Sequence, residues 1–187
     1  HSSEIKIPGK HNVENYLAAI TAVWGDVPHE MICQVAKNFG GVPHRAELVR
    51  VLDGVSYYND SIGTSPTRTA NGTLQLYDRK IILIAGGYDK HIPYDTLGPI
   101  IMDKVKTLIL MGATADKIEA AVKAAPNYRE QEIVILHADS MEKAVALAKE
   151  YAHKGDVVSL SPASASFDLY PNFEARGNHF KNIVNAL

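Results

Sequence analysis

The chain has 187 residues, of which 46% are hydrophobic and 21% are charged, and its formal net charge is -2. That length and composition predict a globular protein with one full domain and part of another. The charge balance gives no basic surface for nucleic acid, and no apolar run approaches the roughly 18 residues of a membrane span. Cys33 is the single cysteine, which excludes an internal disulfide or a cysteine-based zinc site within this chain.

The first 42 residues are expected to hold a tag remnant and two helices. The chain starts with HSS and no methionine, which indicates the scar of a cleaved tag on a fragment of a longer protein. Apolar residues then recur at helical spacing in residues 9–25 and 29–39, which predicts two helices, the first with a buried face. Gly40-Gly41 ends the second helix and gives a flexible joint, so we place a domain boundary there.

Beyond the joint, the pattern changes to strands that alternate with helices. Residues 47–60 predict two strands joined at Asp53-Gly54, a dipeptide that tolerates the positive φ angles of a tight hairpin. Further strands are expected at 80–87, 107–112, 132–139 and 156–164, and helices at 67–77, 94–102, 115–125, 141–152 and from 173 onward. This alternation predicts an α/β domain whose mostly parallel sheet has helices on both faces and an antiparallel hairpin at one edge.

Polar segments interrupt the pattern where each strand ends. NDSIGT follows the second strand, GGYDK the third and SPASAS the sixth. The carboxyl ends of parallel strands share one rim of an open sheet, and ligands bind in the crevice at that rim. The segments are therefore expected to meet at one site.

The residue types in these segments suit an anionic ligand, although each also has a structural interpretation. Lys90 could bind a carboxylate or phosphate, or could be a solvated lysine in an ordinary turn. Ser161, Ser164 and Ser166 could cradle an anion or cap a helix. No histidine-carboxylate partner makes any of these serines a nucleophile, and no histidine spacing indicates a metal site.

Two further charged residues have equally open interpretations. Asp60 could bond a ribose hydroxyl or orient a cation, or could cap the helix that follows it. Arg45 could reach a phosphate from the flexible joint, or could form a salt bridge between domains.

The order of five segments resembles the C-terminal part of the Mur ligases of peptidoglycan synthesis. The segments are GKHNVENYLAA, GVPHRAELV, YYNDSIGTSPTRT, LIAGGYDK and LSPASASFDLYPNFEARGNHF, and they cover nearly the whole chain from Gly9 onward. The similarity is strongest to the members that add D-glutamate to UDP-N-acetylmuramoyl-L-alanine. It implies that residues 1–42 hold the tag remnant and the end of a central ATPase domain, and that residues 43–187 form a C-terminal, Rossmann-like domain that binds the amino acid.

The resemblance also implies the reaction and its setting. ATP phosphorylates the carboxylate of the UDP-linked substrate, and the amine of D-glutamate attacks the acyl phosphate to give an amide, ADP and phosphate. Such chemistry needs positioning and charge neutralisation more than a protein nucleophile, so no catalytic residue is expected in this chain. We expect a monomeric, cytoplasmic bacterial ligase, with Mg²⁺ held mainly by residues outside this chain, and a fragment that is inactive alone.

Residue roles follow from the resemblance by position. Asn12 and Asn15 match positions near the adenine, and Arg45 and Asp60 match residues that hold ATP across the domain interface. The positions that match residues around the amino-acid substrate, where Lys90 would bind a carboxylate, are Thr64, Lys90, Ser166, Phe167 and Phe173.

One departure from the family pattern leaves alternatives open. Ile62 stands where the family has a lysine that also helps to bind glutamate, and Ser65 replaces an asparagine. A sibling ligase that adds L-lysine or meso-diaminopimelate is one alternative. A non-catalytic Rossmann-like binding module for an amino acid or nucleotide is the other.

Overall fold

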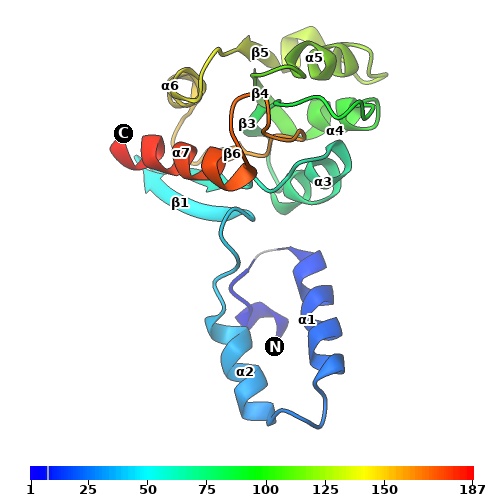
Figure 1. Cartoon of the computed structure of the whole chain (residues 1–187), viewed down its shortest axis with the longest axis vertical. Helices are drawn as coiled ribbons and strands as arrows, with labels where there is room; N and C mark the ends of the chain where they lie inside the picture. Colours follow the sequence, from blue (N-terminus) through cyan, green and yellow to red (C-terminus); the bar gives the residue numbers. More distant parts are fainter. Residues whose placement is uncertain (8) are drawn as a thin grey trace. The chain divides into compact units, whose positions relative to one another are not determined.

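The structure is a computed structural model that describes residues 1–7 and 9–187. Its internal contacts divide the chain into two compact units, His1–Val42 and Pro43–Leu187. Figure 1 shows the helical first unit in blue and the α/β second unit from cyan to red.

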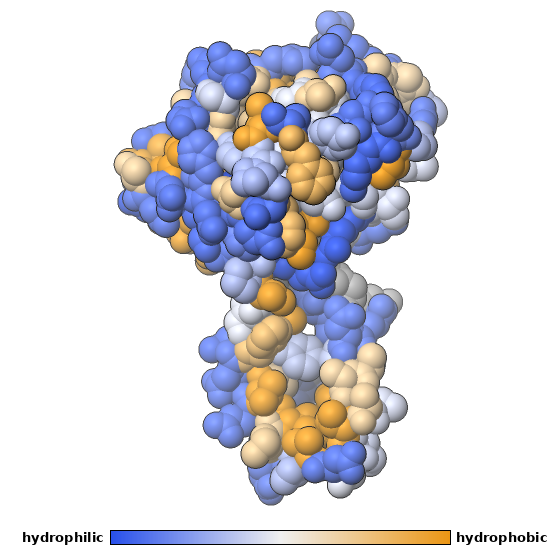
Figure 2. All heavy atoms as spheres, in the orientation of Figure 1, coloured by the Kyte–Doolittle hydropathy of each residue, from blue (hydrophilic) through white to orange (hydrophobic). Residues whose placement is uncertain are grey.

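The first unit consists of a short 3-10 helix, η1 (Ser2–Glu4), and two helices, α1 (Lys10–Ala22) and α2 (His29–Asn38). The expectation that the first helix has a buried face is not met, because none of the described residues of this unit is buried. Leu17 on α1 is 60% exposed and Val35 on α2 is 55% exposed. Two helices alone cannot cover each other's apolar stripes, and Figure 2 shows apolar surface on this unit.

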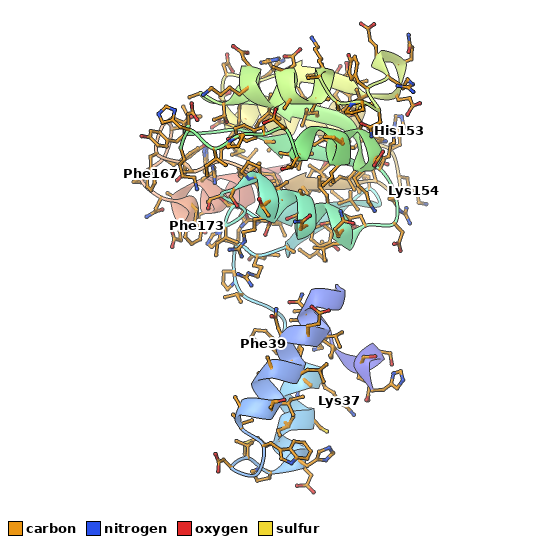
Figure 3. All side chains as sticks on the ribbon, turned by 90° about the vertical axis from the view of Figure 1, so that its right-hand side faces the viewer. Lys37, Phe39, His153, Lys154, Phe167 and Phe173 are labelled. Atoms are coloured by element: carbon orange, nitrogen blue, oxygen red, sulfur yellow. The ribbon has the colours of Figure 1, made fainter. Side chains whose placement is uncertain are left out.

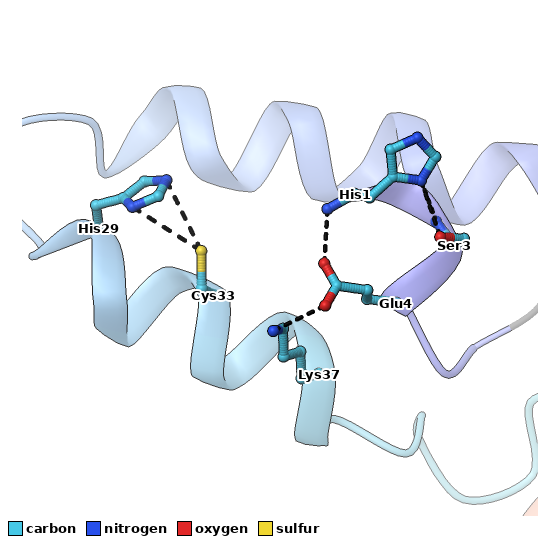
Figure 4. Close-up of polar contacts among 6 residues, drawn as sticks. All are labelled: His1, Ser3, Glu4, His29, Cys33 and Lys37. Atoms are coloured by element: carbon cyan, nitrogen blue, oxygen red, sulfur yellow. Dashed lines mark hydrogen bonds and ion pairs between the residues drawn. The ribbon is translucent and has the colours of Figure 1, made fainter.

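Polar contacts link η1 to α2 within the first unit (Figure 4). Glu4 accepts from Lys37 at 2.8 Å and from the amino terminus at 2.8 Å, and these two cations lower the pKa of Glu4 to about 2. His29 lies one helical turn before Cys33, with 3.7 Å between its Nε2 atom and the sulfur. All of these groups are at the surface, so the contacts contribute little to stability.

The second unit is the predicted α/β domain. Its strands are β1 (Glu47–Leu52), β2 (Val55–Asn59), β3 (Ile81–Ala85), β4 (Val105–Leu110), β5 (Val134–His137) and β6 (Val157–Leu160). They form one sheet in the order β1-β2-β6-β3-β4-β5, in which only the β1–β2 pair is antiparallel. The predicted fold class is confirmed, including the hairpin at the edge, where Asp53 and Gly54 have φ angles of 52° and 81°.

Helices connect these strands. They are α3 (Pro66–Asn71), α4 (Leu97–Lys104), α5 (Ala115–Lys123), α6 (Met141–Tyr151) and α7 (Phe173–Ala186), with 3-10 turns η2 (Thr73–Leu76) and η3 (Glu130–Glu132). The helix predicted at 67–77 is divided at Gly72, whose φ and ψ of -100° and -86° leave the helical region. Among the described residues, no helix combines the length and the hydropathy needed to cross a membrane.

The sheet separates two apolar cores. On β3, Ile81 and Leu83 face the core beneath α4 and α5, whereas Ile82 and Ile84 face the core beneath α6 and α7. This alternation follows from the two-residue period of a strand, and a strand that is buried on both faces is apolar throughout. The layers place helices over both faces and leave the strand ends free to carry polar loops.

Replacing Gly98 on α4 with alanine should destabilise the second unit by about 1–3 kcal/mol, as overpacking does in a dense core. A Cβ atom at Gly98 would lie 2.2 Å from the carbonyl oxygen of Ala121, where α4 crosses α5. The clash outweighs the roughly 1 kcal/mol that alanine gains over glycine in a helix. Urea unfolding measures the change, and Gly40→Ala, which meets nothing within 4 Å, is the control that should stay within about 0.5 kcal/mol.

Candidate functional site

The carboxyl ends of the five parallel strands lie along one rim of the sheet, as predicted. Figure 3 shows Phe167 and Phe173, which follow β6, at one end of the sheet, and His153 and Lys154, which precede β6, at the opposite end. The segments after β2, β3 and β6 therefore meet at the rim that carries Phe167 and Phe173. This rim is the candidate site.

Asp60, at the end of β2, is buried at the centre of a hydroxyl cluster. One oxygen of its carboxylate accepts from the backbone N–H of Ala46 at 3.2 Å, and the other accepts from Ser161 at 2.9 Å and from Thr73. Burial raises the pKa of Asp60, because desolvation disfavours the charged form. Asp60 does not cap α3, whose N-cap residue is Ser65. In this structure Asp60 joins the loops after β2 and β6, and its contact with ATP stays a prediction.

Arg176 on α7 is a buried cation that the sequence reasoning assigned no role. Its guanidinium donates to the Ser61 hydroxyl at 3.0 Å, to the Ser61 carbonyl at 2.9 Å, to the Ser164 carbonyl at 3.1 Å and to the Ala165 carbonyl at 2.9 Å. Burial lowers the pKa of Arg176 to about 10, which leaves it charged at neutral pH. It therefore places a positive charge directly beneath the loops that follow β2 and β6.

The three serines of SPASAS divide into two groups. Ser161 bonds Asp60, and the Ser164 hydroxyl lies 2.7 Å from the Tyr94 hydroxyl and 2.8 Å from that of Thr114. Both are buried and use their hydroxyls inside the protein, which is the structural interpretation of these residues. Ser166 is also buried, at 2% exposed, but its hydroxyl makes no hydrogen bond with any described residue, so it keeps its bonding capacity for a ligand.

Arg45 is an exposed cation on a constrained segment. Its neighbours His44 and Ala46 have positive φ angles of 64° and 43°, which side-chain-bearing residues adopt only where their surroundings hold them. His44 is held at two points: its ring nitrogen accepts from Asn59 at 3.0 Å, and its backbone N–H donates to Glu47 at 2.9 Å. The guanidinium of Arg45 forms no hydrogen bond or ion pair with the described residues and is available for an anion.

The remaining residues assigned to the amino acid also lie on these rim loops. Thr64 is half-buried in the loop before α3, and Phe173, which begins α7, packs edge-on against His44 at 5.9 Å. Phe167 is 65% exposed and contacts Tyr88, with 5.9 Å between the ring centroids. The loops thus gather one threonine, one serine and two phenylalanines along the same edge.

Lys90 lies in the loop after β3, which begins with two glycines. A Cβ atom on Gly86 would lie 2.0 Å from the Met111 carbonyl oxygen, and one on Gly87 would lie 2.2 Å from the Ala165 carbonyl oxygen. Only glycine permits this close approach of the loops after β3, β4 and β6. Lys90 is exposed and forms no hydrogen bond or ion pair with the described residues, so its charge is available at the rim.

Asn12 and Asn15 belong to the first unit. They share one face of α1, and the Asn15 amide donates to the Asn12 side chain at 3.3 Å. Side-chain amides at i and i+3 offer both donors and acceptors, which suits the edge of a purine base. Their role near adenine stays a prediction.

A second polar cluster lies farther along the sheet edge, on α5 and β5. Ligand-type atoms of Asp116, Glu119 and His137 lie within 4.8 Å of one another. Glu119 already pairs with Lys123 and His137 at 2.6 Å each, and these partners lower its pKa. Asp116 and His137 are exposed, and Glu119 already takes part in two ion pairs.

These features define a class of protein. The unit is a doubly covered, mostly parallel α/β domain whose strand-end loops present a free lysine, a buried arginine and hydroxyl donors. The residue types at this rim suit a small anion such as a carboxylate.

Comparison with known families identifies the group to which the chain belongs. Residues 44–164 match the family described as "Mur ligase, glutamate ligase domain". This match covers more than half of the chain, and the chain belongs to the Mur ligase family.

Curated relatives are highly similar over the whole chain. The chain is 54% identical over 187 residues to the UDP-N-acetylmuramoylalanine--D-glutamate ligase of Clostridium acetobutylicum, covering 100% of the chain and 40% of that protein. It is 55% identical over 188 residues to the enzyme of the same name from Acetivibrio thermocellus, with the same coverage of 100% and 40%. The chain thus spans about two fifths of the length of these relatives.

Solved structures share the fold at low sequence identity. Escherichia coli FolC in complex with ADP has a TM-score of 0.65 at 17% identity, covering 97% of this chain and 41% of that one. MurF from Acinetobacter baumannii has a TM-score of 0.61 at 16% identity, covering 98% of this chain and 39% of that one. These likenesses confirm the fold.

Replacing Arg176 with methionine should destabilise the second unit by about 3–5 kcal/mol, because four buried acceptors would lose their donor. Urea unfolding of the chain measures the loss. Arg50→Met is the matched control, since the Arg50 guanidinium donates to the carbonyls of Val184 and Asn185 at the end of α7 and lies nearer the surface. The control should lose no more than about 1 kcal/mol, and equal losses in both variants would contradict the role given to Arg176.

Proposed function

We propose that the chain is the C-terminal part of a UDP-N-acetylmuramoyl-L-alanine:D-glutamate ligase, an ATP-dependent enzyme of bacterial peptidoglycan synthesis. In this proposal the second unit binds D-glutamate, and the first unit is the end of the central ATPase domain. The single observation that carries the proposal is the identity of 54–55% along the entire chain to ligases of that name.

The geometry of the rim supports an amino-acid site. D-Glutamate carries two carboxylates and one amine, so its site needs cations and neutral donors but must leave the amine free to attack. Lys90 supplies a mobile cation, and Ser166 and Thr64 supply hydroxyls on adjacent loops. Arg176 adds a fixed positive charge beneath the loops, which favours an anion even without direct contact.

ATP, when bound, would supply the phosphoryl group that activates the carboxylate of the UDP-linked substrate. The chain's own contribution is to hold the amine of D-glutamate where it can attack the resulting acyl phosphate and to neutralise developing negative charge. Arg45 suits a phosphate because its free guanidinium projects from a backbone fixed by His44 and Glu47. Holding the amine in position and neutralising charge require no covalent intermediate on the protein.

Related structures support the assignment of ATP and a divalent cation. FolC was solved with ADP, and a bifunctional folylpolyglutamate synthase/dihydrofolate synthase from Yersinia pestis was solved with AMPPNP and a Mn ion. Arg45 and the amides of Asn12 and Asn15 are suited to phosphate and adenine, respectively. Asp60 is less suited to a metal ion, because three internal hydrogen bonds already occupy its carboxylate. We therefore assign Mg²⁺ to ligands outside this chain.

The apolar surface of the first unit also supports a longer protein. Trp24 is 70% exposed, Met31 is 54% exposed and Phe39 is 42% exposed on or beside the two helices. Exposure of this extent is unusual for apolar side chains of a complete domain and is typical of a surface that packs against further chain. We propose that the ATPase domain covers it in a monomeric, cytoplasmic enzyme.

Phosphate release by the full-length protein tests the function. With ATP, Mg²⁺ and UDP-N-acetylmuramoyl-L-alanine present, we expect release to depend on D-glutamate and not on L-glutamate, L-lysine or meso-diaminopimelate. Release dependent on L-lysine or diaminopimelate would identify a sibling ligase, and release with none of the four would favour a binding module. The chain alone, which spans 40% of its relatives, should be inactive and serves as the blank.

Replacing Lys90 with methionine should impair glutamate use first. Loss of a cation that holds a carboxylate should raise KM for D-glutamate about tenfold or more, while KM for ATP stays within about twofold. Steady-state kinetics with each substrate varied in turn measure the effect. An equal rise for ATP would contradict the placement of Lys90 at the amino acid, and Lys80→Met, at the start of β3, is the control on the opposite rim.

A further inference from the structure

The loop after β3 that carries Lys90 is held in place on both sides. On one side, Gly87 donates to the Thr114 hydroxyl at 3.1 Å and accepts from the Thr114 backbone at 3.0 Å. Tyr88 then donates to the Ala165 carbonyl at 3.0 Å and stacks edge-on with Phe167. These contacts fix the chain up to the residue that precedes Asp89-Lys90.

On the other side, Asp89 holds the turn that presents Lys90. One oxygen of the Asp89 carboxylate accepts from the backbone N–H of His91 at 2.8 Å, which closes a turn around Lys90. This turn requires a φ angle of 59° at His91, a conformation that side-chain-bearing residues adopt only with support. The carboxylate of Asp89 therefore sets the backbone from which the Lys90 side chain leaves.

The second oxygen of Asp89 pairs with Lys117, which lies on α5, and it also lies 3.5 Å from the Nδ1 atom of the exposed His91 ring. Asp89 is mostly buried, with 19% of its side chain exposed, whereas Lys117 is 52% exposed. The hydrogen bond from Lys117 lowers the pKa of Asp89 and keeps it ionised. Helix α5 is itself fixed against the sheet by Ile118 and Val122, both fully buried. The ion pair thus ties the Lys90 turn to a rigid element.

The ion pair between Asp89 and Lys117 also neutralises a negative charge next to Lys90. Asp89 is the immediate neighbour of Lys90, and an unpaired carboxylate there would compete for the ammonium group and repel an incoming dicarboxylate. Lys117 supplies the opposite charge that removes this competition. Lys90 itself has no partner among the described residues, which is consistent with a lysine kept available for a ligand.

We propose that Lys117 is a positioning residue for the amino-acid substrate: by pairing with Asp89, it keeps Lys90 free to bind the carboxylate of D-glutamate. This inference rests on the proposed function and extends it to a residue outside the recognised motifs. In this proposal the effect of Lys117 is carried by Asp89 and the turn at Lys90.

Variants of the full-length enzyme that remove these charges test the proposal. Lys117→Met should raise KM for D-glutamate roughly three- to fivefold, the scale of a surface ion pair, with kcat and KM for ATP unchanged. The double variant Asp89→Asn with Lys117→Met should bring KM back to within about twofold of the wild-type value, because asparagine still accepts from His91 and carries no charge, so that only the tie to α5 is lost. The rise should shrink in high salt, which screens exposed charges.

A matched control lies on the same helix. Lys123 pairs with Glu119 at 2.6 Å, so Lys123→Met breaks an ion pair of α5 away from the Lys90 turn and should leave KM unchanged. A Lys117→Met enzyme with wild-type KM, or a double variant as impaired as the single one, would overturn the inference while leaving the ligase function intact. A wild-type protein that releases no phosphate with D-glutamate overturns the proposed function and this inference with it.

Discussion

The rim of the second unit depends on the guanidinium of Arg176. Its four hydrogen bonds join the loop after β2 to the loop after β6, and both loops carry residues assigned to the substrate. A buried arginine is costly to desolvate unless all its donors find acceptors, and here backbone carbonyls supply most of them. The loops must therefore keep one mutual geometry, since any separation would leave a buried charge without partners.

Asp60 also joins the loops after β2 and β6, as a buried acceptor of hydrogen bonds where Arg176 is a buried donor. Its carboxylate accepts hydrogen bonds from a hydroxyl in the loop after β6, from a hydroxyl of η2 and from the backbone N–H of Ala46, which follows Arg45. A buried carboxyl group and a buried cation thus fix the loops from below, while Lys90 and Arg45 are exposed and the Ser166 hydroxyl has no hydrogen-bond partner among the described residues. This separation of structural from available polar groups is what a site that works by positioning requires.

The site also depends on backbone that glycine alone can form. Gly86 and Gly87 let the loop after β3 approach the loops after β4 and β6 to distances that a side chain would block. The consequence is that the turn bearing Lys90 receives support from α5 on one flank and from the Phe167 segment on the other. Rigid loops lower the entropic cost of binding a small ligand in one orientation.

The sequence by itself determined the alternation of strands and helices, the edge hairpin, the rim and the family, because period-2 and period-3.6 patterns and short motifs are local properties. It did not determine which polar residues at the rim are used internally. Ser161 and Ser164 differ from Ser166 only in the partners that distant segments bring to them, and Arg176 gave no local signal within α7. The apolar spacing in α1 and α2 likewise predicts a buried face, but residues such as Leu17 and Val35 are exposed, because burial depends on what packs against a helix. Those properties arise from contacts between residues far apart in the chain, and so only the tertiary structure decided them.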